Sequence, residues 1–290
     1  MKKIIILIPV YNDWESFKKL ILEINEIIKD FKEVLIDCFV INDASTINQP
    51  DLKKPKNIGS IKILNMKKNK GHARCNAFGI RYLIKKEKFD FLILMDGDGE
   101  DRPIEIKSLI NQILKNPNLS VVAKRVKRSE GPFFQFLYFM HKLITLILTG
   151  EKINFGNYSC LTRKDAETIS SKANLWSSYS GTVKKNIKNF GFINSTRGNR
   201  YFGPSKMSFF KLLIHSLSII AVFKFKVFFR SSIIIFLLIY LNKYLGVITL
   251  VTILGLLILN LIIFIVSFRA KKEELINSQE NLNNIQTLEH

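Results

Sequence analysis

The chain has 290 residues, which is enough for one large domain and an appendage, and it is strongly basic. Lys and Arg number 44 against 24 Asp and Glu, so the formal net charge is +20 at pH 7. Such a balance implies an anionic partner: nucleic acid, anionic lipid headgroups or a phosphorylated substrate. The three cysteines are odd in number and lack metal-type spacing, which argues against a disulfide framework and for reduced thiols in the cytosol.

The first part of the chain alternates between strand-like and helix-like segments. We expect strands over 3–9, 34–41, 60–64, 90–95 and 119–123, and helices from an N-cap at Asp13 to about Ile28, over 70–86 and over 103–114. This alternation predicts an α/β domain with a mainly parallel, Rossmann-like sheet and helices on both faces. Ligands of such sheets bind at the carboxyl ends of the strands, where Asn12, Asp43 and Asp96 all fall.

The most informative stretch is the apolar strand that runs directly into Asp96-Gly97-Asp98. Residues i and i+2 of an extended strand end point the same way, so the two carboxylates can reach one cation together. Hard oxygen ligands suit Mg²⁺ or Mn²⁺, and either ion can in turn hold a diphosphate. The competing interpretation is an acidic turn that caps the helix starting near Pro103.

The pattern changes after Lys124. The segment 133–148 is rich in aromatic residues, which fits either a core helix of the domain or a lipid-facing helix beside an acceptor site. The segment 207–226 is amphipathic and directly precedes an apolar region, so we expect it to lie in a membrane interface.

The C-terminal third contains two candidate membrane spans. Leu245–Phe268 holds 24 residues without a charged side chain, and as a helix it would be roughly 36 Å long, enough to cross a bilayer. Ser231–Asn242 is shorter, and it can span only if Arg230 and Lys243 extend their side chains to opposite interfaces.

The basic residues around these spans indicate a hairpin with both ends in the cytoplasm. They are Lys224, Lys226 and Arg230 before the first span and Arg269, Lys271 and Lys272 after the second. Because the N-terminus lacks the pattern of a signal peptide, we expect a cytoplasmic N-terminal domain on a multi-pass protein of the inner (plasma) membrane.

These features divide the chain into a domain over 1–206, a juxtamembrane helix over 207–226, a hairpin over 227–268 and a cytoplasmic tail over 269–290. The tail is polar and rich in Asn and Gln, and we expect it to be partly helical and without a catalytic role. Its last three residues, Leu288-Glu289-His290, look like the remnant of a purification tag.

Three other protein classes fit the residues less well. A dinucleotide-binding Rossmann domain needs a glycine-rich loop after the first strand, where this chain has Pro-Val-Tyr-Asn-Asp. A P-loop enzyme is excluded because no Gly-rich Lys-Ser/Thr loop is present. Nucleic-acid binding would explain the charge but neither the hairpin nor the strand that ends in two aspartates, so we expect no nucleic-acid partner.

Four blocks in order resemble the family 2 glycosyltransferases of the GT-A fold. They are Ile8-Pro9-Val10-Tyr11-Asn12, Asn42-Asp43-Ala44-Ser45, Asn69-Lys70-Gly71-His72-Ala73-Arg74 and Asp96-Gly97-Asp98. The run from Asp96 to Glu105 is similar to the signature of the polyprenyl-phosphate sugar transferases, and the similarity extends over about residues 3–206. The juxtamembrane helix and hairpin also match the bacterial two-span members of that subgroup.

The resemblance implies a nucleoside-diphosphate-sugar donor and roles for particular residues. Those expected around the nucleotide are Pro9, Tyr11, Asn12, Asp43, Lys70, Gly71 and Arg74. The candidate catalytic set is Asp96, Asp98, Asp101, Arg125 and Arg128, with Asp96 and Asp98 contacting the metal (Mg²⁺ or Mn²⁺) and the arginines facing phosphates. Arg200, Ser205 and Lys206 resemble a stretch near the acceptor, and Arg200 and Lys206 join the candidate binding residues.

One departure from the family concerns the acceptor. Related lipid-phosphate transferases read Gly-Asp-Phe-Arg-Leu where this chain has Gly156-Asn157-Tyr158-Ser159-Cys160-Leu161, so Asn157 cannot serve as a base. A polyprenyl monophosphate needs no base because it is mostly ionised near neutrality. A hydroxyl acceptor needs a carboxylate to take up its proton. The nearest candidates for that carboxylate are Glu100 and Asp101.

The expected function is inverting, metal-dependent transfer of a sugar to a membrane lipid of the cell envelope, and the layout favours polyprenyl phosphate. The alternatives are a hydroxyl acceptor, such as a glycolipid, diacylglycerol or envelope polysaccharide, and a non-catalytic membrane scaffold with a decayed transferase domain. Anionic membrane lipids are expected partners, and a homo-oligomer is left open.

Overall fold

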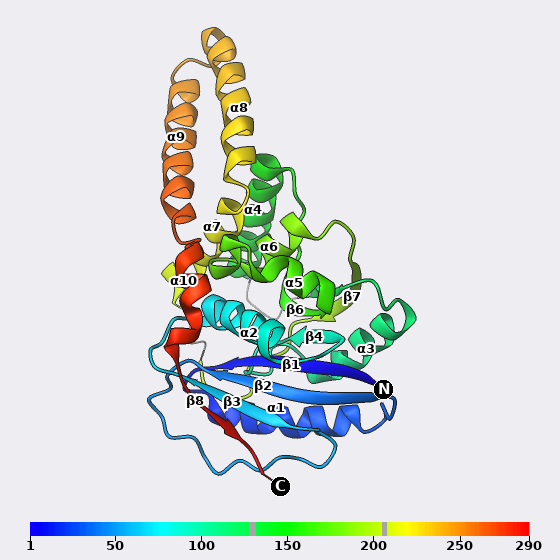
Figure 1. Ribbon diagram of the computed structural model, residues 1–290. Coiled ribbons are helices and arrows are strands. Elements are labelled where there is room, and N and C mark those ends of the chain that lie inside the picture. The colour runs from blue at the N-terminus through cyan, green and yellow to red at the C-terminus, as the bar shows by residue number, and fades with distance from the viewer. Residues whose placement is uncertain (128–131, 205–207, 290) are drawn as a thin grey trace.

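The protein is described from a computed structural model, which covers residues 1–289 except 128–131 and 205–207 (Figure 1). Its centre is an eight-stranded sheet with the order β7-β5-β6-β4-β1-β2-β3-β8 among the described residues. The strands are β1 (Lys2–Val10), β2 (Val34–Asn42), β3 (Ile61–Met66), β4 (Phe91–Leu94), β5 (Val121–Lys127), β6 (Phe155–Thr162), β7 (Gly191–Thr196) and β8 (Leu282–Thr287).

The central strand β1 is apolar on both faces because both faces of the sheet are covered. Residues 4–8 are fully buried, and such continuous apolar runs are typical of parallel strands inside α/β proteins. Successive side chains enter opposite layers: Ile4 belongs to one hydrophobic core and Ile5 to the other. Burying a side chain of this size contributes about 1.5–3 kcal/mol, so this strand anchors the domain.

The helices form a layer on each face of the sheet. One core contains α1 (Trp14–Ile28) and α3 (Ile106–Lys115), which follows the short 3₁₀ turn Pro103–Glu105. The other contains α2 (His72–Lys86), α5 (Arg163–Ser170) and α6 (Tyr179–Asn186), together with the 3₁₀ segment η2 (Ala173–Trp176). The expected helices and strands of the first 123 residues are confirmed, with end points that differ by a few residues.

The sheet is mixed, with mostly parallel strands and the GT-A arrangement that the sequence predicted. Parallel pairs join β1 to β2 and β4, β2 to β3, and β5 to β7. β6 runs antiparallel between β4 and β5, and β8 runs antiparallel to β3. The carboxyl ends of β1, β2 and β4 therefore meet at one edge, which brings the predicted site residues together.

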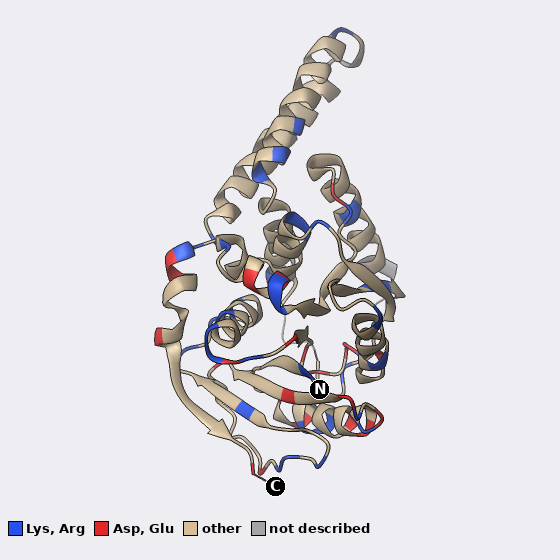
Figure 2. Cartoon of the chain, turned by 45° about the vertical axis from the view of Figure 1, so that its right-hand side comes forward, with Lys and Arg blue, Asp and Glu red and all other residues tan. Residues whose placement is uncertain are grey.

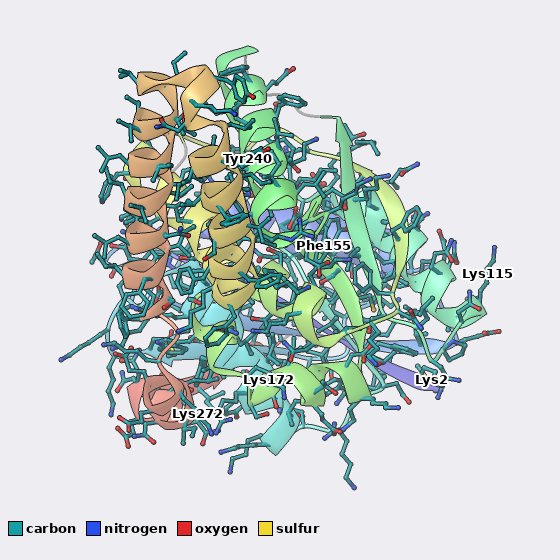
Figure 3. The ribbon with its side chains drawn as sticks, turned by 90° about the horizontal axis from the view of Figure 1, so that it is seen from above. Lys2, Lys115, Phe155, Lys172, Tyr240 and Lys272 are labelled. Carbon is teal, nitrogen blue, oxygen red and sulfur yellow. The ribbon has the colours of Figure 1, made fainter. Side chains whose placement is uncertain are left out.

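Two C-terminal helices are long and apolar enough to cross a membrane. They are α8 (Lys224–Leu245) and α9 (Val247–Ser267), which form an extended hairpin that projects from the domain (Figures 1 and 2). α9 carries no charged residue, and the charged residues of α8 are all basic, namely Lys224, Lys226, Arg230 and Lys243. Seen from above, α8 and α9 stand side by side with α4 (Pro132–Thr149) against α8 (Figure 3). The hydroxyl of Ser231 donates to Oδ1 of Asn260 at 3.2 Å between the two long helices.

The two faces of α4 differ in burial, so the core interpretation is confirmed for one face and the lipid-facing interpretation of the other stays a prediction. Thr145, Leu148 and Thr149 are buried against the protein. The opposite side exposes a stripe of apolar side chains at helical spacing, namely Phe136, Phe139, Leu143, Leu146 and Ile147. An exposed stripe of this size is typical of a surface that meets a membrane or another protein.

The juxtamembrane helix α7 (Phe209–Ala221) is exposed in its first half and buried in its last turn. Phe210, Lys211 and Leu213 are exposed, whereas Ser218 and Ile220 are buried. The helix therefore does not turn one face to the domain and the other to solvent, and its location in a membrane interface stays a prediction.

The tail was predicted to be partly helical, and that prediction is wrong for its last part. After α10 (Lys272–Ile276) and a 3₁₀ segment η3 (Asn277–Asn281), the chain forms β8 at the edge of the sheet. Leu288, set aside above as part of a tag remnant, is buried, and its N–H donates to the carbonyl of Ile61 at 3.0 Å. A strand that pairs with a partner more than 200 residues away leaves no local signal in a polar sequence.

Candidate active site

The loop that follows β4 carries the three aspartates and turns sharply beneath the end of β1. Gly97 passes so close to the chain that a Cβ there would lie 3.0 Å from the carbonyl oxygen of Pro9. Gly99 has φ = +88°, which glycine adopts without strain. The two glycines therefore allow the chain to reverse over residues 96–101 while both aspartates stay at the edge of the sheet.

Asp96 lies beside His72, at the start of α2. Nε2 of His72 is 2.8 Å from Oδ1 of Asp96, but the two atoms lack the alignment of a hydrogen bond. Burial alone would raise the pKa of Asp96, yet the His72 imidazole, with Arg125 and Arg197, brings it well below its usual range. Asp96 is therefore an anion at any physiological pH.

Asp98 is held by Arg200. Nη1 of Arg200 lies 2.5 Å from Oδ2 of Asp98, and Nη2 contacts the carboxylate of Asp13 at the start of α1. Burial, with the negative charges of Asp96 and Glu100, raises the pKa of Asp98 to about 6. Asp13 was predicted to cap α1, but its carboxylate accepts from the Ser16 hydroxyl and pairs with Arg200 instead of bonding a backbone N–H.

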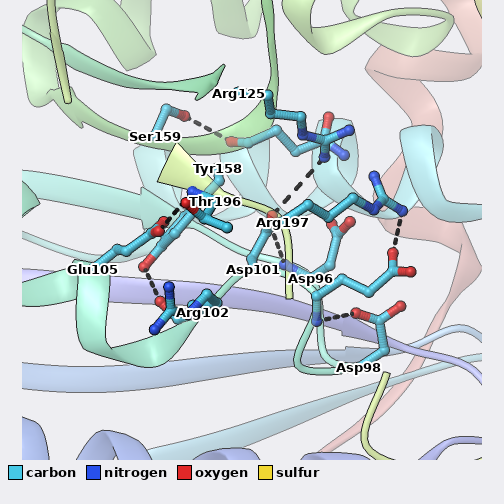
Figure 4. A network of polar contacts seen from close by, with 12 residues as sticks. Asp96, Asp98, Asp101, Arg102, Glu105, Arg125, Tyr158, Ser159, Thr196 and Arg197 are labelled. Atoms are coloured by element: carbon cyan, nitrogen blue, oxygen red, sulfur yellow. Dashed lines mark hydrogen bonds and ion pairs between the residues drawn. The ribbon is translucent and has the colours of Figure 1, made fainter. Parts of the chain in front are cut away.

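Asp101 lies beside Asp96, and both are drawn above Asp98 in Figure 4. Its Oδ2 accepts the N–H of Asp96 at 3.0 Å, and Nη2 of Arg125 lies 3.9 Å from its Oδ1. Burial and the charge of Asp96 raise the pKa of Asp101 to about 7. Arg125 reaches this position by crossing Gly156, where a Cβ would come within 2.9 Å of the guanidinium.

The segment that follows β7 lies over the aspartate loop. Arg197 forms an ion pair with Glu100, and the N–H of Gly198 donates to the carbonyl of Glu100 at 2.8 Å (Figure 4). The N–H of Tyr201 donates to the carbonyl of Asp98 at 2.9 Å. These contacts join the loop to residues about 100 positions later, which sequence spacing alone could not show.

A further set of hydrogen bonds fixes the far side of the loop. The hydroxyl of Tyr158 donates to the carbonyl of Arg102 at 3.0 Å, and the N–H of Thr196 donates to Glu105 at 2.9 Å (Figure 4). Tyr158 and Glu105 are both buried, so these bonds are shielded from water.

The residues expected around the nucleotide gather at the ends of β1 and β2. Asp43 accepts from the backbone N–H groups of Lys70 at 2.7 Å and Gly71 at 2.8 Å, so it fixes the turn before α2. Oδ1 of Asn12 accepts from the N–H groups of Thr46 at 2.7 Å and Ile47 at 3.1 Å, which holds the loop after β2.

The other predicted residues of this region differ in exposure. Pro9 lies in β1 opposite Ile41, whereas Tyr11 is 39% exposed and can meet a ligand. The guanidinium of Arg74 lies 5.6 Å from the ring centre of Trp176.

The residues at the family departure take different positions. The amide of Asn157 lies 3.4 Å from Nδ1 of His72, so it borders the site. Ser159 is fully buried and contacts the hydroxyl of Tyr179 at 2.6 Å, so it belongs to the core. The predicted residues Arg128, Ser205 and Lys206 lie outside the described residues.

Several residues that contact the aspartate loop, directly or through Arg200, had no site role in the sequence analysis, among them His72, Asp13 and Arg197. His72 stood inside a recognised block, and its position at the first turn of a helix next to the nucleotide turn was a usable signal. Arg197 carried no signal, because its contact with Glu100 depends on how β7 ends.

The helix α7 also approaches the site. Burial, with the nearby charges of His72 and Arg125, lowers the pKa of His215 to about 4. A neutral imidazole of the juxtamembrane helix thus lies near the carboxylate cluster.

The donor set fits a divalent cation bound together with a substrate. Among the described residues, no group of three or more His, Cys, Asp and Glu side chains is arranged to hold a metal alone. Mg²⁺ commonly takes one or two carboxylates and fills its other positions with phosphates and water. Oδ1 of Asp96 is buried without a hydrogen-bond partner, which is a hard oxygen of the required kind.

The sequence model of glycosyl transferase family 2 matches residues 5–170, more than half of the chain. The chain belongs to glycosyl transferase family 2. It is a glycosyltransferase with a GT-A domain, as the four sequence blocks predicted.

Comparison with solved structures supports the fold of this family 2 transferase. It is similar to glucosyl-3-phosphoglycerate synthase from Mycobacterium tuberculosis in complex with Mn²⁺, UDP-glucose and phosphoglyceric acid, with a TM-score of 0.53 and 12% identity over 78% of this chain and 80% of that one. The complex of the same enzyme with Mn²⁺, UDP and phosphoglyceric acid gives a TM-score of 0.51 and 12% identity, with 78% of each chain covered.

Among curated proteins, an uncharacterized protein of Methanocaldococcus jannaschii is 25% identical over 114 residues. The alignment covers 38% of this transferase and 46% of that protein, so the chain spans about half of the relative's length.

Proposed function

We propose that this glycosyltransferase moves a sugar from a nucleoside diphosphate to a lipid phosphate, a polyprenyl phosphate, at the cytoplasmic face of the plasma membrane. The observation that carries the proposal is the pair Asp96 and Asp98 at the carboxyl end of a GT-A sheet, in a chain that also carries an apolar helical hairpin. Family membership and the Mn²⁺ and UDP-glucose held by a structural neighbour support the donor and a divalent metal, Mg²⁺ or Mn²⁺.

Asp96 and Asp98 would hold the cation, which would supply positive charge to the leaving diphosphate. Asp96 suits this role because it is already ionised and its Oδ1, which lies beside the His72 imidazole, makes no hydrogen bond. Arg125, Arg197 and Arg200 surround the aspartate loop, and their fixed charges favour a phosphate group that gains negative charge during transfer.

The state of the nearby acids favours an acceptor that is already ionised. A hydroxyl acceptor would need a base within hydrogen-bond reach. Asp101 is only 4% exposed and accepts the N–H of Asp96, while Glu100 pairs with Arg197, so the two expected bases are engaged. A phosphate monoester, whose second pKa is about 6, supplies its own nucleophilic oxygen near neutrality.

The apolar surfaces support a lipid acceptor. The exposed stripe of α4, the exposed N-terminal half of α7 and the hairpin would lie together at the membrane boundary. A cavity of about 310 Å³ between α4 and α8, lined by Ile147, Phe229, Arg230, Ile233 and Ile234, combines apolar walls with one guanidinium.

A basic cluster at the base of the hairpin supports contact with anionic lipids. Lys226 pairs with Glu151 at 2.6 Å and Lys184 with the same carboxylate at 3.6 Å, while Lys185 donates to the carbonyl of Val222. With Arg230 these residues bring more positive than negative charge to the level where lipid headgroups would lie.

The test is a parallel acceptor assay on the purified full-length protein in bilayers. Labelled UDP- and GDP-sugars are supplied with polyprenyl phosphate in one series and with diacylglycerol or a neutral glycolipid in the other. We expect label to enter the polyprenyl phosphate fraction only, and to be lost when Mg²⁺ and Mn²⁺ are chelated. Label in the neutral lipid alone would replace the phosphate acceptor with a hydroxyl acceptor, and nucleotide binding without any transfer would favour a scaffold.

A further inference from the structure

The chain after the second apolar helix returns to the domain and is bound there along its whole length. We name residues 272–287, comprising α10, η3 and β8, the C-terminal strap. Leu275 of the strap is fully buried in the core on the α2 face of the sheet. The N–H of Lys67 donates to the carbonyl of Asn281 at 2.7 Å, and the amide of Asn65 donates to that of Asn284 at 2.6 Å.

The strap reaches the first turn of α2 through one tryptophan. Nε1 of Trp176 donates to Oε2 of Glu274 at 2.9 Å, and the Trp176 side chain is almost fully buried. The guanidinium of Arg74 lies 5.6 Å from the centre of the Trp176 ring, within the range of a cation–π contact. Three side chains thus connect the strap to α2 in the order Glu274, Trp176, Arg74.

The connected turn is also the turn that lines the site. Arg74 is two residues from His72, which contacts Asp96. The N–H groups of Lys70 and Gly71, immediately before α2, bind Asp43. A shift of this turn would therefore move the nucleotide side of the site and the neighbour of Asp96 together.

The charges around Glu274 are consistent with a connection from the strap through Trp176 to Arg74. The pKa of Glu274 is lowered by its hydrogen bonds from Lys271 and Trp176, and the charge of Arg74 contributes further. Lys271 binds the other carboxylate oxygen of Glu274 at 2.7 Å but is 57% exposed, so water competes for that contact. The bond from the buried Trp176 is partly shielded from water, although Glu274 is itself 36% exposed, and it is the contact that can fix the geometry.

We propose that Trp176 and Glu274 are positioning residues that hold the first turn of α2 in place for the sugar nucleotide. The strap thereby couples the donor site to the segment that leaves the apolar hairpin. This inference rests on the proposed function, because the nucleotide is the donor assigned there. Neither residue touches the reacting groups; both act through Arg74 and the turn that carries His72.

The test uses the full-length protein in detergent with UDP and GDP as probes in the presence of Mn²⁺. Trp176→Phe keeps the ring beneath Arg74 and removes only the N–H donor, while Glu274→Ala removes the acceptor. We expect either change to weaken nucleotide binding about five- to tenfold, as loss of a partly buried hydrogen bond to a charged group would. The double variant should be no weaker than the weaker single variant, because both changes break the same connection.

Two further variants separate positioning from general stability. Glu274→Gln keeps an oxygen that accepts from Trp176, so it should restore nucleotide binding to within about twofold of wild type. Lys271→Ala removes only the exposed ion pair and should also behave as wild type. With the donor that is turned over, KM should rise in Glu274→Ala and Trp176→Phe while kcat changes less than about twofold.

The outcomes distinguish the inference from the function on which it rests. Suppose that the wild type binds and turns over a sugar nucleotide, and that Trp176→Phe and Glu274→Ala bind it as tightly as the wild type. This result overturns the positioning role and leaves the proposed function in place. The positioning role is also overturned if KM rises while kcat and the melting temperature fall to a similar extent, and Glu274→Gln does not restore them. That result would mean that the Trp176–Glu274 bond only stabilises the fold. A wild-type protein that binds neither nucleotide overturns the proposed donor and this inference together.

Discussion

Three aspartates within six residues have different surroundings and therefore different chemical states. Asp96 faces an imidazole and stays ionised, whereas burial and the neighbouring carboxylates raise the pKa values of Asp98 and Asp101 to about 6 and about 7. A divalent cation would relieve the repulsion between these groups, which explains why so many acids can be kept in one partly buried loop.

The first prediction at this scale concerns metal binding. Asp98→Asn should weaken Mn²⁺ binding in the presence of UDP or GDP at least tenfold, because a neutral amide is a poor ligand for a hard cation. Electron paramagnetic resonance of free Mn²⁺ measures the change. Asp90→Asn is a matched control, since Asp90 also flanks β4 but pairs with Lys2 at the other end of the strand. Equal Mn²⁺ binding by the wild type, Asp98→Asn and Asp90→Asn would exclude Asp98 as a ligand of the cation.

The second prediction concerns Asp101 and pH. A carboxyl whose pKa is raised on folding binds its proton more tightly in the folded state. Its contribution to stability is complete below about pH 4 and is lost as the pH rises through about 7. Replacing it with Asn removes this loss, so Asp101→Asn should gain stability relative to wild type between pH 5 and pH 8, by at most about 1.4 kcal/mol per pH unit.

Thermal unfolding of both proteins without divalent metal, at several pH values, measures this difference. A difference in melting temperature between wild type and Asp101→Asn that does not change with pH would show that Asp101 titrates normally.

At the scale of elements, the site depends on contacts between segments that are distant in sequence. The loop after β4 is covered by residues 197–201, and Gly99 lies against the ring of Tyr201. A Cβ at Gly99 would lie 2.6 Å from the ring of Tyr201, and the φ of +88° adds strain for any other residue.

We predict that Gly99→Ala displaces Tyr201 and weakens nucleotide binding in the presence of Mn²⁺ by about tenfold or more, because a misplaced loop no longer presents both aspartates. Gly203→Ala is the matched control, since Gly203 also has a positive φ, of +65°, but a Cβ there meets nothing within 4 Å. Calorimetric titration with UDP or GDP compares the two variants. Equal effects of both substitutions would mean that backbone strain, and not the contact with Tyr201, is responsible.

The same scale shows what could be predicted from the sequence. The parallel strands, their helices and the placement of Asn12, Asp43 and Asp96 at one edge followed from local patterns, because buried parallel strands are continuous apolar runs. The position of β6 between β4 and β5, the pairing of β8 and the role of Arg197 did not, since each depends on a partner far along the chain. Asp13 was placed correctly at the start of α1, but its partner Arg200 lies 187 residues away.

At the scale of the whole molecule, the strap and the hairpin give the domain a fixed attachment to its apolar appendage. The chain leaves the domain at α7 and returns through α10 to the far edge of the sheet (Figure 1). If the hairpin crosses a membrane, both attachments lie on one side of it.

Basic residues lie at the start of α8 and directly after α9, where the hairpin joins the domain. They predict that both ends of the hairpin lie on the cytoplasmic side of the membrane. A cysteine introduced at Lys243, in the turn of the hairpin, should react with a membrane-impermeant maleimide in intact cells. A cysteine at Lys271 should react only after the membrane is permeabilised. Cys38, Cys75 and Cys160 are buried, so the unaltered protein serves as the background. Equal labelling at both positions in intact cells would contradict the hairpin topology.

The central claim is that one edge of the sheet holds a divalent cation and a sugar nucleotide and delivers the sugar to a lipid in the adjoining bilayer. The most direct measurement is transfer of labelled sugar from UDP- or GDP-sugars into the organic phase by the reconstituted protein. The account predicts transfer that requires Mg²⁺ or Mn²⁺ and falls at least a hundredfold in Asp96→Asn, since both the charge and the cation are lost. Transfer that persists at the wild-type rate in Asp96→Asn, or in excess chelator, would contradict it.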